Sequence, residues 1–105
     1  MSFKWPPKDK DEQLDYSVDW SRFLGDATIS GIVWYVDDSS GTKTVLTEGS
    51  TVNGIQNVAQ TISGDVATIN LGLGTANYDY KFTCRMTDNS GSIAERVIRL
   101  KIKEQ

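Results

Sequence analysis

The chain has 105 residues, a formal net charge of −3 at pH 7, one cysteine and no histidine. This length suits a single small domain, and the acidic balance argues against non-specific binding to nucleic acid. The absence of histidine excludes Ser-His-Asp and Cys-His nucleophiles and histidine-ligated metals, and one cysteine allows neither an internal disulfide nor a thiolate cluster.

The N-terminal stretch combines aromatic residues with a proline pair. Phe3 and Trp5 precede Pro6 and Pro7, and proline lacks the N–H donor that a regular central strand needs. Two interpretations are open. The aromatic side chains fold back over one end of the domain, or the segment is an extended arm on which Phe3, Trp5, Pro6 and Pro7 bind a neighbouring subunit.

A dense charge run at 8–13 follows the prolines. Calcium requires several converging oxygen ligands, commonly in a loop with glycine, whereas this run has two lysines and no glycine. We therefore expect a solvated linker rather than a metal site or a catalytic acid/base pair. The predicted organisation is an arm and linker at 1–13 and a folded domain at 14–105.

Alternation of apolar and polar residues predicts strands through most of the remaining chain. The predicted strands cover residues 14–20, 28–36, 43–49, 57–63, 65–71, 78–86 and 95–104. A short helical turn and then a turn at Gly25 and Asp26 separate the first two. The clearest strand is 78–86, where the residues predicted to face the core are Tyr78, Tyr80, Phe82, Cys84 and Met86. Burial there predicts an inert thiol, because desolvation raises the pKa of cysteine.

Three loops carry residue types that also occur in ligand sites. The acidic loops "DDSSG" (37–41) and "DNSG" (88–91) have the composition that tight turns require, so we interpret them as turns. The glycine-bearing "GLGTAN" (72–77) precedes no predicted helix, so it lacks the helix N-terminus of a phosphate site. No cofactor is expected at these loops.

Short strands, turn signals about every ten residues and no convincing helix predict an all-β fold. The prediction is an immunoglobulin-like antiparallel β-sandwich of about seven strands with an extended N-terminal arm, and a small barrel is the alternative. Cys84 resembles the cysteine of the F strand in such domains, and Trp34 resembles the tryptophan that packs on their disulfide. Phe82 occupies the place of the tyrosine corner, which is therefore absent or displaced to Tyr80 or Tyr78.

Charge is unevenly distributed along the chain. Up to Asp65 there are ten acidic and five basic residues, and beyond it four acidic and six basic ones, so the two parts carry about −5 and +2. Two interpretations follow: acidic and basic strands lie side by side, or copies associate head to tail. Arg85, Arg99 and Lys101 are expected to form an outward basic stripe.

Two motifs carry a family resemblance. Residues 3–30, "FKWPPKDKDEQLDYSVDWSRFLGDATIS", resemble the N-terminal signature of small tailed-bacteriophage structural proteins known as fiber–tail adaptor proteins. There, F-x-W-P-x-K-D precedes L-D-Y-x-[IV]-D-W and L-G-x-x-T-I-S. The later "GTANYDYKFTCRMTDNSG" and "ERVIRLKIKE" resemble the end of the same proteins. Lys10 departs from the pattern, since proline is common at that position.

The resemblance implies a non-enzymatic structural protein of the virion that joins neck or tail components and fibers. Implied partners are portal, connector, tail or fiber subunits, with symmetric multiple copies in the particle and no nucleic acid or membrane. We expect a virion location and assembly in host cytoplasm, since no signal sequence or membrane-spanning apolar run is visible. The alternatives are a capsid decoration protein and a carbohydrate-binding sandwich that uses Trp5, Trp20 or Tyr35.

Overall fold

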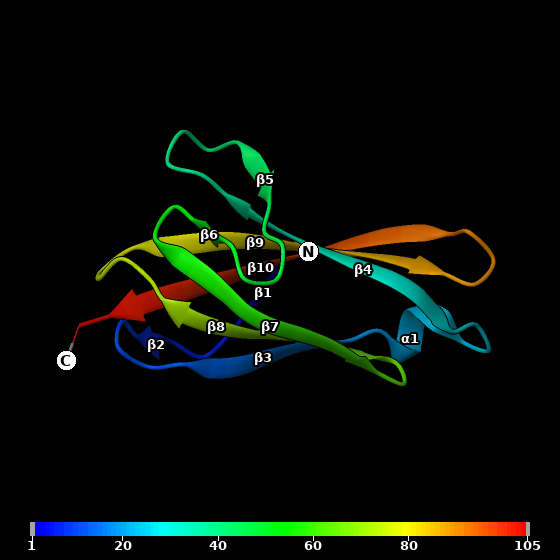
Figure 1. The fold of residues 1–105 in the computed structure, drawn as a ribbon. Coiled ribbons are helices and arrows are strands. Elements are labelled where there is room, and N and C mark those ends of the chain that lie inside the picture. Colours follow the sequence, from blue (N-terminus) through cyan, green and yellow to red (C-terminus); the bar gives the residue numbers. More distant parts are fainter. Residues whose placement is uncertain (1, 105) are drawn as a thin grey trace.

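Two β-sheets pack face to face in the computed structural model, which describes the backbone of residues 2–104 and the side chains of residues 4–104 (Figure 1). The elements are β1 (Ser2–Lys4), β2 (Lys8–Asp9), β3 (Leu14–Asp19), α1 (Ser21–Leu24), β4 (Ile29–Asp37), β5 (Lys43–Val45), β6 (Thr51–Val52), β7 (Ile55–Ser63), β8 (Val66–Leu73), β9 (Asp79–Asp88) and β10 (Ile93–Lys103). The larger sheet has the order β1-β10-β9-β4-β5, with β2 also paired to β10, and the smaller sheet has the order β3-β8-β7-β6. The predicted all-β sandwich is confirmed, the barrel is not formed, and the immunoglobulin-like subtype stays a prediction.

The core lies between the two sheets and follows the alternation of the sequence. Inward side chains with little or no exposure include Tyr16, Val18, Trp20, Trp34, Val36, Ala67, Ile69, Leu71, Tyr80, Phe82, Cys84, Met86, Ile98, Leu100 and Ile102. Burial raises the pKa of the Cys84 thiol to about 12, which keeps the thiol protonated at neutral pH.

The prediction that Tyr78 faces the core is wrong, because the chain is still turning at this residue. The Tyr78 amide donates to the Thr75 carbonyl oxygen at 3.2 Å, and the residue is 36% exposed. The next tyrosine, Tyr80, is buried and bonds to two loops through its hydroxyl, whereas the tyrosine corner itself stays a prediction. The Tyr80 hydroxyl accepts from the Thr75 amide at 2.9 Å and donates to the Asn53 carbonyl oxygen at 2.6 Å. One buried ring therefore ties two loops at this end of the sandwich.

The two acidic loops are turns, as predicted. Oδ1 of Asp38 accepts hydrogen bonds from the amides of Ser40 and Thr42, and Oδ1 of Asp88 accepts them from the amides of Ser90 and Ser92. The Ser40 and Ser90 hydroxyls donate to the same two Oδ1 atoms at 2.7 Å, and they, together with these amides, favour the ionised carboxylates and hold the pKa values of both aspartates below their usual range. The carboxylates replace backbone partners in the turn rather than gathering around a ligand.

Acidic and basic strands do not lie side by side. The acidic strand β3 pairs with β8 in the smaller sheet, whereas the basic strands β9 and β10 pair with each other in the larger sheet. The acidic strand β3 and the basic strands β9 and β10 are therefore not hydrogen-bonded neighbours, and Asp19 of β3 lines one recess together with Lys4 of β1 and Arg96 of β10. Among the described residues, no helix has the length and apolar character needed to cross a membrane.

Candidate functional site

Trp5 lies inside the core of its own chain. Its ring stacks on Tyr16 with 4.8 Å between centroids and contacts Phe82 at 5.5 Å and Trp34 at 5.9 Å. Nε1 donates to the Ser17 carbonyl oxygen at 3.2 Å, and the side chain is only 9% exposed. In this structure Trp5 therefore folds back onto the sandwich, which is the first of the two interpretations that the sequence left open.

Lys8 is fully buried beyond the prolines. Its Nζ donates to the carbonyl oxygen of Leu73 at 2.6 Å and to that of Asp9 at 2.8 Å. Burial lowers the pKa of Lys8, and the neighbouring carboxylates partly oppose this shift. The expectation of a solvated linker is wrong for Lys8 and Asp9. The reason is that β2 pairs with β10 and places Lys8 beside the inward residue Ile102.

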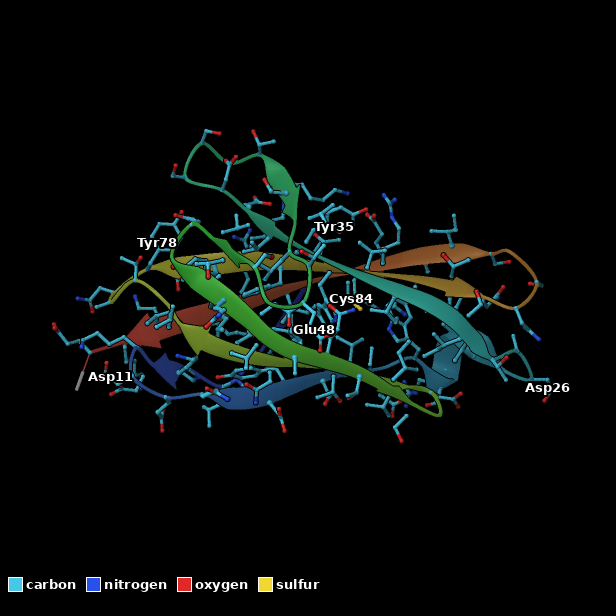
Figure 2. The ribbon with its side chains drawn as sticks, in the orientation of Figure 1. Asp11, Asp26, Tyr35, Glu48, Tyr78 and Cys84 are labelled. Carbon is cyan, nitrogen blue, oxygen red and sulfur yellow. The ribbon has the colours of Figure 1, made fainter. Side chains whose placement is uncertain are left out.

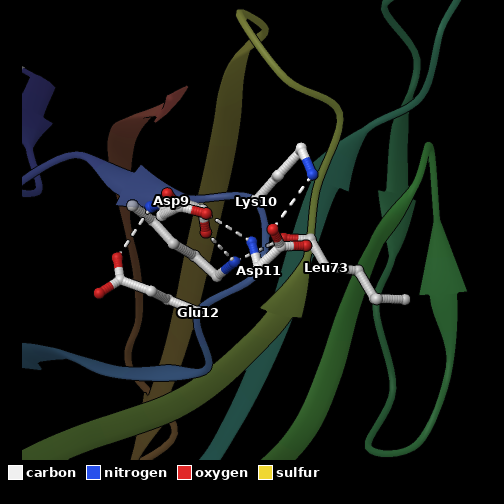
Figure 3. A network of polar contacts seen from close by, with 6 residues as sticks. Asp9, Lys10, Asp11, Glu12 and Leu73 are labelled. Atoms are coloured by element: carbon white, nitrogen blue, oxygen red, sulfur yellow. Dashed lines mark hydrogen bonds and ion pairs between the residues drawn. The ribbon is translucent and has the colours of Figure 1, made fainter. Parts of the chain in front are cut away.

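The carboxylates of the charge run stabilise a turn (Figure 3). Oδ1 of Asp9 accepts from the Asp11 amide at 2.8 Å, and Oε1 of Glu12 accepts from the Asp9 amide at 2.9 Å. The Glu12 amide donates in turn to the Asp9 carbonyl oxygen at 3.1 Å. Within residues 4–104, no cluster of three or more His, Cys, Asp and Glu side chains has an arrangement that could hold a metal ion. The run therefore closes a loop between β2 and β3.

Pro6 and Pro7 are exposed between these two buried anchors. The Pro6 carbonyl oxygen accepts from the Tyr16 hydroxyl at 3.2 Å, and burial is the main cause that raises the pKa of Tyr16 to about 12. The backbone of Phe3 pairs with Ile98, and its side chain lies outside the described part of the chain. The structure tests neither the partner-binding role of Phe3, Trp5, Pro6 and Pro7 nor the division at 13/14, so both stay predictions.

Leu73 and Tyr78 are two exposed side chains at the same end of the molecule as the proline pair, and the sequence pattern assigned no surface role to them. Leu73 is 54% exposed and has a φ of 59°, and its carbonyl oxygen binds Lys8. Tyr78 is exposed in the loop that follows (Figure 2). The positive φ of Leu73 costs about 1 kcal/mol or more, because a left-handed backbone is unfavourable for a residue other than glycine. We call Pro6, Pro7, Leu73 and Tyr78 the proline end.

A second surface lies on the outer face of the larger sheet, around Tyr35 (Figure 2). Lys43 Nζ lies 4.9 Å and Arg85 Cζ 5.2 Å from the Tyr35 ring centroid, and both cations bind Glu95. Exposed apolar residues on this sheet are Val33, Val45 and Ile93. Tyrosine and arginine beside apolar side chains are typical of protein interfaces. We call this surface the Tyr35 face.

The aromatic residues considered for sugar binding are mostly covered. Trp5 and Trp20 are buried, and the guanidinium of Arg96 lies 4.7 Å from the Trp20 ring. Tyr35 is partly exposed, with cations near its ring. Trp5 and Trp20 therefore offer no exposed aromatic platform for a sugar.

Residues 8–101 match the family model described as "Podophage GP4 fiber-tail adaptor protein gp77". The matched range starts at the buried Lys8, directly after the proline pair, and includes all strands from β3 to β9 together with most of β10. No curated protein sequence matches the chain.

Proposed function

The chain belongs to the podophage fiber-tail adaptor family, and we propose that it is a non-enzymatic structural protein that joins neck or tail components of the virion to fibers. The observation that carries this proposal is the family match, which extends over almost the whole sandwich. Its place of action is the virion, and its incorporation takes place in the host cytoplasm.

An adaptor must hold two different partners, and the chain offers two separate apolar surfaces for this purpose. The proline end has a preset backbone, because prolines have a fixed φ and little conformational entropy to lose on binding. The buried anchors Trp5 and Lys8 hold the prolines from both sides. We propose that Phe3, Pro6 and Pro7 contact one virion partner, that Trp5 positions them, and that the Tyr35 face binds the other.

A density map of the intact particle tests the proposed location. We expect the chain at the junction of tail and fibers. Density for it on the icosahedral shell would instead assign it as a capsid decoration protein and would refute the adaptor role.

Incorporation into particles tests the proposed surface. The variant Pro6→Glu/Pro7→Glu changes two exposed residues and is expected to fold but to be missing from purified virions. The variant Thr61→Glu/Ser63→Glu is the control, because it adds the same charge at exposed positions of β7 in the smaller sheet, away from the proline end and from the Tyr35 face. Equal incorporation of both variants would contradict a docking role for the proline pair.

A further inference from the structure

Part of β4 lies at the edge of the larger sheet without a neighbouring strand. On the side away from β9, β5 pairs with residues 35–37 of β4, and the Leu46 amide then donates to the Trp34 carbonyl oxygen at 2.9 Å. The chain turns at 47–50, whereas β4 continues alone toward its first residue (Figure 1). In the described part of the chain, no strand therefore covers this edge of β4 at residues 29–33.

The peptide groups of Ile32 point to this open edge. Successive residues of a strand direct their N–H and C=O groups to opposite edges. Since the Trp34 carbonyl oxygen points toward β5, the N–H and C=O groups of Ile32 point to the same side, beyond the end of β5. A bulge between Ile29 and Gly31 shortens the regular edge but does not reach Ile32. Ile32 therefore offers one donor and one acceptor to an incoming strand.

Other edges of the two sheets are protected against strand addition. The strands β1 and β2 pair along the outer edge of β10. On β3, the Trp5 indole donates to the Ser17 carbonyl oxygen, and on β7 the Glu48 carboxylate accepts from the Gln60 amide at 3.0 Å. Residues 29–33 of β4, in contrast, contain neither a proline nor a charged side chain, which are common means of blocking an edge.

An apolar recess of about 290 Å³ lies beside the open edge. Ile32, Trp34 and Leu46 contribute apolar side chains to it, and the exposed Thr47 also lines it. Side chains directly opposite each other in paired strands lie on the same face, so a residue paired with Ile32 places its side chain in this recess. The two neighbours of that residue face outward beside the exposed Val33. The site thus fits an extended segment that directs an apolar side chain inward.

We propose that β4 accepts an extended segment of a partner protein as an additional strand, paired with Ile32 and with one apolar side chain in the recess. Main-chain hydrogen bonds supply affinity in this mode, and the recess selects the side chain. The inference rests on the proposed function for the identity of the partner, because it gives the partner of the neighbouring Tyr35 face an extended form. Peptide binding tests this form, whereas the density map of the particle tests the adaptor role separately.

Selection from displayed random peptides of about nine residues, within the usual length of a strand, tests the proposal on the full chain. We expect enriched peptides with apolar residues at alternate positions, and the strongest binder is then synthesised. Amide hydrogen exchange measured by NMR reports the contact directly. The Ile32 amide is expected to exchange quickly in the free chain and to be protected in the complex with this peptide.

Two pairs of variants separate the backbone from the recess. Both Ile32→Pro and Ile32→Ala shorten the side chain, but only proline removes the edge N–H, so we expect the proline variant to bind the peptide about tenfold more weakly. Thr47→Trp fills the recess and is expected to weaken binding. Its control, Gln13→Trp, adds the same side chain at an exposed position before β3, at the opposite edge of the smaller sheet.

Circular dichroism establishes that each variant is folded, and Thr47→Trp together with the exchange measurement decides the question if Ile32→Pro does not fold. The proposal is overturned by a selection without enriched peptides, by an Ile32 amide that stays unprotected in the complex, or by equal binding to both members of either variant pair. Self-association of the peptide-free chain that Ile32→Pro abolishes would assign the edge to a second copy and would also overturn it.

Discussion

Replacement of Trp5 by alanine tests whether the N-terminal segment is part of the folded domain. The ring contacts three aromatic side chains, with centroid distances of 4.8, 5.5 and 5.9 Å, and its Nε1 donates one hydrogen bond. Replacement of a buried tryptophan by alanine costs about 3 to 5 kcal/mol. We expect the lower end of this range, because a recess lined by Trp5, Ser17 and Val18 lets water enter the space.

Urea unfolding followed by circular dichroism measures this change. We expect Trp5→Ala to lower the free energy of unfolding by about 3 kcal/mol at an unchanged m-value, a large part of the stability of a small domain. The control is Ser39→Ala, which alters an exposed position and is expected to stay within about 0.5 kcal/mol. A loss below about 1 kcal/mol for Trp5→Ala would refute the buried role of the ring and favour a free arm.

Three further changes test the anchors and the core. Lys8→Met removes the donor to two carbonyl oxygens and is expected to lower the free energy of unfolding by about 2 kcal/mol in urea titrations; an unchanged value would contradict the anchor. Leu73→Gly relieves a φ of 59° and is expected to preserve or raise stability while reducing incorporation into virions; normal incorporation would remove Leu73 from the proline end. The Cys84 thiol is expected to resist disulfide reagents at neutral pH in the folded protein and to react in urea. Because folding raises its pKa from 9.0 to about 12, stability is lost as pH rises across that range, and Cys84→Ala is expected to show a shallower alkaline loss. Equal alkaline slopes would contradict the pKa shift.

The fold was predictable where the pattern is local. The alternation at 78–86 predicted a core strand, and the structure buries Tyr80, Phe82, Cys84 and Met86. The two acidic loops were predictable for the same reason, because an aspartate that accepts amide hydrogen bonds two and four residues later is a property of the turn itself.

The N-terminal segment was not predictable because its partners are distant in the sequence. Strands β1 and β2 have three and two residues, too few for a visible alternation, and both pair with β10 at the other end of the chain. Lys8 is buried because β2 pairs with β10 and because a carbonyl oxygen 65 residues away accepts a hydrogen bond from its Nζ. In the sequence alone, a lysine within a charge run is indistinguishable from a solvated one.

The proline pair also determines which kind of contact the proline end is able to make. An exposed sheet edge invites a partner strand, but Pro6 and Pro7 lie between β1 and β2 on the edge next to β10, where neither residue offers an N–H donor. Strand addition is therefore blocked at this point. A partner that docks here must bind by packing against the proline rings, Leu73 and Tyr78, so its own surface is expected to be apolar and preformed rather than an extended strand.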